Sequence, residues 1–192
     1  MKQFLKNNGV LIAGIVLPLA LMLVFHIAEV ATRASVADPQ YDLIFTANGY
    51  GDPSWHVGVE NEQLIVRYTP PKTPPVGYVT PKPQLYRLDH RTMTASLLNI
   101  NYDHIVDGVV QDPAIDEINK NRLSTTAESP DGYQLIYDYN YHSGIFPELF
   151  GFGYDHSSNV LRKGARNVPV KADGVTYYIS AQLVGWIIGP KT

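Results

Sequence analysis

The chain of 192 residues contains no cysteine. This absence excludes disulfide scaffolds, thiolate zinc sites, iron–sulfur centres and cysteine nucleophiles together. An excess of positive charge is also missing, because 15 lysine and arginine residues face 18 aspartate and glutamate residues and leave a net charge of −3. Domains that bind nucleic acid usually have a pI above about 9. We therefore expect no nucleic-acid partner.

The short motifs that mark common enzyme classes are absent as well. The sequence has no HExxH zinc motif, no GxSxG nucleophile elbow, no phosphate-binding loop, no dinucleotide-binding glycine pattern and no EF-hand spacing. An active site would have to be assembled from residues that lie far apart in the chain. The sequence thus predicts no catalytic residue, no metal ligand and no cofactor.

The most distinctive feature that is present is an uncharged run near the N-terminus. From Gly9 to Phe25 no side chain is charged or polar, and extension to Ala31 gives a segment over residues 9–31. At 1.5 Å per residue, a helix of about 23 residues crosses a hydrocarbon core of about 30 Å. Pro18 is tolerated because neighbouring groups in a bilayer helix adjust to the lost hydrogen bond. We expect a transmembrane anchor that binds the lipid bilayer through residues 9–31.

Basic residues set the expected orientation of this anchor. Lys2 and Lys6 precede the span, whereas Arg33 is the only basic residue in the 30 or so residues that follow it. The positive-inside rule places residues 1–8 in the cytoplasm and the C-terminal domain in the periplasm, with a single pass through a bacterial inner membrane. A secretory signal cleaved after Ala37 is the alternative, since Ser35 and Ala37 are small residues. The domain is exported in either case.

The remainder of the chain predicts a mainly β fold. We expect a tether at 32–40 and an exported β domain at 41–192. Outside these two segments the only charged side chains are Lys2, Lys6 and Glu29, so the tether and the domain together have a net charge of −4. Alternating residues and turn signals predict hairpins around residues 60–62 and 89–92, a strand within 128–141 and a long final strand at 175–188, bent at Gly185. Residues 113–120 predict one short helix with Asp112 as its N-cap.

A proline-rich stretch interrupts this pattern at residues 70–83, where six of fourteen residues are proline. Proline has no backbone donor for a ladder, so we expect an extended loop. The predicted fold class is therefore a single transmembrane helix followed by a compact antiparallel β-meander or sandwich with at most one short helix.

Two segments resemble pieces of TolB-type β-propeller blades. In "RLDHRTMTASLL", Asp89 and Thr92 occupy the strand-end and turn positions of such a blade. In "AESPDGYQLIYD", residues 129–132 match the Ser-Pro-Asp-Gly turn that opens the next blade. The resemblance covers about residues 85–98 and 127–138, and it implies hairpins like those of propeller blades. No repeat with the period of a whole propeller is visible, and the resemblance implies no catalytic residues.

An aromatic and glycine-rich segment, "IFPELFGFGY", has the most unusual composition outside the anchor. It either caps the β domain or stays exposed, because exposed apolar patches are typical of interaction sites. The apolar end "LVGWII" raises the same question. The candidate interaction patch consists of Phe146, Leu149, Phe150, Phe152 and Trp186.

The sequence gives weaker evidence for polar functional sites. His142, Asp155 and His156 flank the aromatic segment and form one candidate polar site. Asp103, His104 and Asp107 form another close group, for which a solvated turn is the simpler interpretation. Tyr133, Tyr137 and Tyr139 alternate along one predicted strand and would suit a ligand-binding face.

These features lead to one expected function and two alternatives. The anchor, the proline-rich loop and the apolar segments predict a membrane-anchored periplasmic β domain that acts through protein–protein contacts with an envelope partner. The first alternative is an exported hydrolase that uses the region of His142 and His156. The second is a binding module for envelope carbohydrate or a small ligand.

Overall fold

The computed structural model describes residues 2–47, 54–73, 80–138, 158–164, 166–172 and 181–191. The chain divides into two compact units, Met1–Ala37 and Asp38–Thr192. The first unit is one long helix, α1 (Lys2–Ala34), which includes Pro18. Its stretch from Asn8 to Ala28 is long and apolar enough to cross a membrane, as the sequence predicts.

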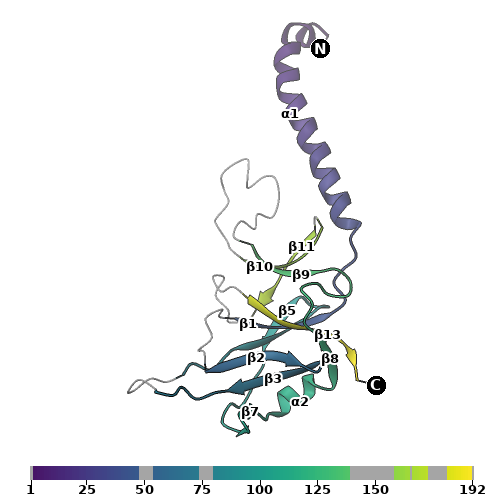
Figure 1. The fold of residues 1–192 in the computed structure, drawn as a ribbon. Helices are drawn as coiled ribbons and strands as arrows, with labels where there is room; N and C mark the ends of the chain where they lie inside the picture. Colours follow the sequence, from purple (N-terminus) through teal and green to yellow (C-terminus); the bar gives the residue numbers. More distant parts are fainter. Residues whose placement is uncertain are drawn as a thin grey trace. The chain divides into compact units, whose positions relative to one another are not determined.

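The regular structure described in the second unit consists of strands and one short helix, joined by loops (Figure 1). The strands are β1 (Asp42–Ala47), β2 (Trp55–Glu60), β3 (Gln63–Tyr68), β4 (Leu85–Asp89), β5 (Thr94–Leu97), β6 (Ile105–Val106), β7 (Val109–Val110), β8 (Asn121–Ser124), β9 (Gln134–Asp138), β10 (Ser158–Lys163), β11 (Arg166–Pro169), β12 (Lys171–Ala172) and β13 (Ala181–Pro190). The prediction of a mainly β unit after an apolar helix is confirmed.

A six-stranded sheet in the order β12-β5-β4-β1-β13-β8 forms the centre of this unit. All its pairs are antiparallel except the short pair of β12 and β5. β1 is a central strand, and its consecutive residues Leu43, Ile44 and Phe45 are all buried. Because successive side chains point to opposite faces of a sheet, both faces of the sheet are covered at β1.

One face packs on a four-stranded sheet in the order β2-β3-β7-β6 and on a short helix, α2 (Pro113–Ile118). The core on this side joins residues from the two sheets, α2 and the loop before β6: Ile44, Leu64, Val66, Leu85, Tyr102, Val110, Ile115, Ile118 and Leu123. α2 begins where the sequence predicts it, because the side chain of Asp112 accepts a hydrogen bond from the Ala114 amide at 2.7 Å and so caps the helix.

The third sheet, in the order β11-β10-β9, is smaller and antiparallel. The predicted hairpins are confirmed where β2 meets β3 and where β4 meets β5. The final strand, β13, is bent as predicted, since its register with β1 shifts beside Gly185. A side chain at position 185 would meet Val59 Cγ2 at 3.1 Å and the Ser124 carbonyl oxygen at 3.2 Å, so the close packing there favours glycine.

Of the two predicted arrangements, a meander or a sandwich, the structure fits the sandwich. The six-stranded sheet is not a meander, because β1 lies between β4 and the C-terminal β13, and it packs on the four-stranded sheet. The two segments that resemble propeller blades also belong to different sheets, β4 and β5 to the central one and β9 to the smallest.

The predicted tether is shorter than expected. Residues 38–40 belong to the β unit, where Pro39 is buried and the Gln40 amide donates a hydrogen bond to Asp131 Oδ2 at 2.8 Å. Arg166 forms an ion pair with Asp38. These contacts hold the start of the β unit in place directly after Ala37.

Candidate functional site

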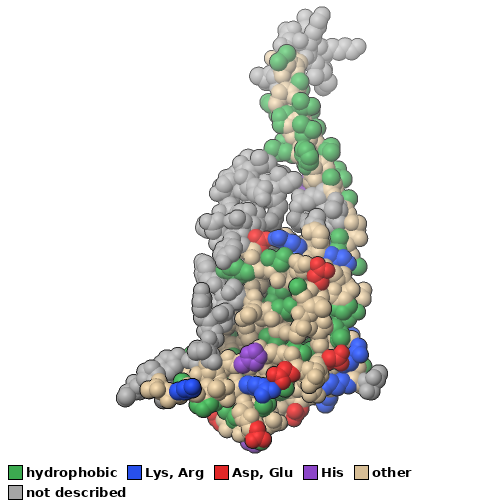
Figure 2. Space-filling model, viewed as in Figure 1, with side chains coloured by type: hydrophobic (Ala, Val, Ile, Leu, Met, Phe, Trp, Pro, Cys, Tyr) green, Lys and Arg blue, Asp and Glu red, His purple; other side chains and the backbone are tan. Residues whose placement is uncertain are grey.

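The apolar surface of α1 is the clearest functional feature that the structure describes. Most of the described large hydrophobic side chains between Val10 and Val30 are 49% to 91% exposed. Figure 2 shows these hydrophobic side chains along the helix. Exposed apolar surface on this scale is unfavourable in water and is typical of a segment that a membrane or a partner covers.

The candidate interaction patch of the sequence is only partly within the described residues. Phe146, Leu149, Phe150 and Phe152 lie outside them. Trp186 is completely buried, and its indole Nε1 donates a hydrogen bond to the Thr126 carbonyl oxygen at 3.0 Å. The inclusion of Trp186 in an exposed patch is therefore corrected, because this ring belongs to the core of the β unit.

The polar candidates give a similar result. His142, Asp155 and His156 lie outside the described residues, so this site stays a prediction. Asp103 is an exposed residue that pairs with Lys82 at 2.9 Å. Asp107 has a positive φ of 51° in the turn between β6 and β7. These positions of Asp103 and Asp107 fit the simpler interpretation of a solvated turn.

One of the three tyrosines predicted to line a ligand-binding face is buried. Tyr133 is completely buried, whereas Tyr137 is partly exposed and Tyr139 lies outside the described residues. Burial raises the pKa of the Tyr133 hydroxyl. The buried Tyr133 ring therefore contributes to the packing of the β unit.

The proline-rich loop is fixed to the β unit at its C-terminal end. The Tyr102 hydroxyl donates a hydrogen bond to the Pro83 carbonyl oxygen, and burial of this ring raises the pKa of Tyr102 to about 12. Trp55 packs against Tyr102 with 5.2 Å between the ring centroids. Residues 74–79, in the middle of the loop, lie outside the described residues.

A cluster of charged side chains that sequence reasoning missed surrounds Asp42, the first residue of β1. Antiparallel pairing of β1 with β4 brings Asp42 beside Arg87 and the turn after Asp89. Arg87 Nη2 donates to Asp42 Oδ2 at 2.7 Å. The His90 amide donates to Asp42 Oδ1 at 3.0 Å, and His90 Nδ1 lies 2.6 Å from the same oxygen. The only local signal was the Asp-His turn, because 45 residues separate Asp42 from Arg87.

The electrostatics of this cluster favour an ionised Asp42. Burial raises the pKa of its carboxyl group, but the hydrogen bonds from His90 and Arg87 together outweigh burial and lower the pKa below 3.8. Asp42, Asp89 and His90 each place one ligand atom within 4.8 Å of the others, so these residues could hold a metal ion. The Arg87 guanidinium already balances the Asp42 charge, which favours a structural ion pair at this position.

We expect Asp42→Asn to destabilise the β unit by roughly 1.5–3 kcal/mol at pH 7, because the charged hydrogen bonds to Arg87 and His90 are lost. The lowered pKa means that this contribution is complete above pH 3.8 and disappears as the pH falls through the pKa of the folded state. Urea unfolding of the original protein and of Asp42→Asn should therefore show a difference in the free energy of unfolding that becomes smaller below pH 3.8.

Glu60→Gln is the matched control for this measurement. Glu60 pairs with Arg67 at 2.6 Å, but both side chains are more than 40% exposed. An exposed pair of this kind contributes about 0–1 kcal/mol. An Asp42→Asn difference as small as that of Glu60→Gln, or one that does not change with pH, would contradict a structural role for the Asp42 cluster.

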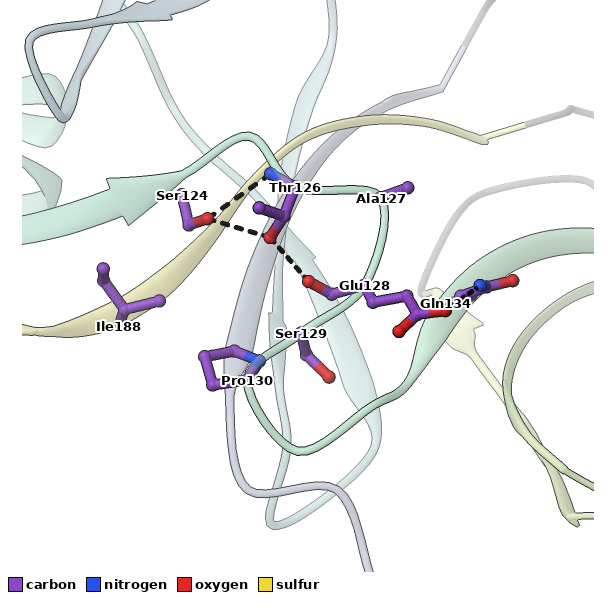
Figure 3. Close-up of a pocket in the computed structure, with 8 residues that line it drawn as sticks. All are labelled: Ser124, Thr126, Ala127, Glu128, Ser129, Pro130, Gln134 and Ile188. Atoms are coloured by element: carbon purple, nitrogen blue, oxygen red, sulfur yellow. Dashed lines mark hydrogen bonds between the residues drawn. The ribbon is translucent and has the colours of Figure 1, made fainter.

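Two hollows lie on the described part of the β unit. One of about 380 Å³ adjoins the Asp42 cluster and is lined by Asp38, Pro39, His90, Arg91, Met93 and Val168. The other is an open groove of about 610 Å³ between the segment after β8 and the end of β13 (Figure 3). In this groove Thr126 Oγ1 lies 2.9 Å from Ser124 Oγ and donates to the Glu128 carbonyl oxygen at 2.6 Å. The groove offers hydroxyl, amide and carboxylate groups beside Pro130 and Ile188, as a protein-contact surface does.

Compared with known proteins, the chain matches no family model, no curated protein and no solved structure.

Proposed function

We propose that this protein is a single-pass membrane protein whose β unit lies outside the cytoplasm and acts through contacts with envelope protein. The observation that carries the proposal is the apolar stretch Asn8–Ala28, none of which is buried inside the protein. A helix of this length and composition gains free energy in a bilayer, since each buried CH₂ group contributes about 0.8 kcal/mol.

The orientation of the anchor follows from its flanking charges. Lys2 and Lys6 precede the stretch, and the segment after it contains one basic residue before Arg67. This asymmetry favours a cytoplasmic N-terminus in a bacterial inner membrane and a periplasmic β unit.

Contact with protein partners is supported by the surface of the β unit. The groove in Figure 3 is open, and it mixes polar groups with Pro130 and Ile188. Protein interfaces also combine polar and apolar groups. The alternative function, a hydrolase, depends on His142 and His156. The other alternative, a ligand-binding module, is less well supported because the Tyr133 ring is buried.

Fractionation and protease protection test the membrane part of the proposal. We expect the full chain to remain in the membrane pellet after an alkaline carbonate wash. In spheroplasts, added protease should digest the β unit and spare a fragment that contains residues 1–8. A soluble protein shortened by its first 37 residues would instead establish the cleaved secretory signal.

Cross-linking in intact cells tests the proposed contact between the β unit and an envelope protein. Recovery of a cross-linked envelope protein supports the proposal. Recovery of the chain without any protein, together with turnover that His142→Ala or His156→Ala abolishes, would overturn it in favour of the hydrolase.

A further inference from the structure

We draw no further inference here: the strongest candidate, the hollow of about 380 Å³ that His90, Arg91 and Met93 line at the turn after β4, belongs to the Asp42 cluster already described, and nothing among the described residues shows which ligand would occupy it.

Discussion

Replacement of Leu17 and Leu21 by arginine is expected to release the protein from the membrane. Both side chains lie in the middle of the apolar stretch and are about half exposed or more. An arginine near the centre of a membrane helix costs about 2.5–3.5 kcal/mol, and each lost leucine removes a further contribution of about 0.3–0.6 kcal/mol. The double variant should therefore lose roughly 6–8 kcal/mol of insertion free energy.

Carbonate extraction and protease protection measure this effect. The pellet fraction should fall from nearly all of the protein to a small part of it. Leu17→Ala with Leu21→Ala is the control, because alanine keeps the stretch uncharged and should leave the protein in the pellet. Equal membrane retention of the arginine and alanine variants would contradict a transmembrane role for α1.

The second large effect is expected at Trp186. Trp186→Ala should destabilise the β unit by about 3–5 kcal/mol, since the ring is completely buried and its removal leaves a cavity. Domains of this kind are stable by only about 5–15 kcal/mol, so the variant would be close to unfolding. Denaturant unfolding followed by circular dichroism measures the loss.

Trp186→Phe separates the two contributions of this side chain. Phenylalanine keeps most of the apolar volume but loses the hydrogen bond from Nε1 to Thr126. The loss should therefore be clearly smaller than for alanine. If Trp186→Ala instead kept full stability and abolished capture of an envelope partner, Trp186 would be an interaction residue after all.

The Trp186 experiment illustrates where sequence reasoning reached its limit. The apolar run around Trp186 predicts equally a core strand and an exposed patch, because composition does not show what covers a side chain. β13 pairs with β1 on one side and with β8 on the other, and these pairings place Trp186 between Leu43 and Ser124. Burial is therefore a consequence of long-range pairing between the two ends of the β unit.

Local features were predicted well for a physical reason. The hairpin between β2 and β3 and the cap at Asp112 depend on residues that are near one another in the chain. Turn and capping preferences act over a few residues, so a single sequence displays them. The order of the strands depends instead on contacts between distant segments, so the sequence left a meander and a sandwich as alternatives that only the strand pairing separates.

The Asp42 cluster shows the same division. Asp42 meets Arg87 and His90 only because β1 lies beside β4. The cluster is therefore not a property of any one of these residues by itself.

By itself, the sequence determined the apolar helix, the β character of the described remainder, the short helix α2 and the exclusion of cysteine chemistry. These follow from composition and short-range patterns, which do not depend on the rest of the fold. The tertiary structure decided which aromatic rings are buried and which charged groups meet. Those properties arise when strands far apart in the chain pair with one another, and the pairing depends on the packing of the whole β unit.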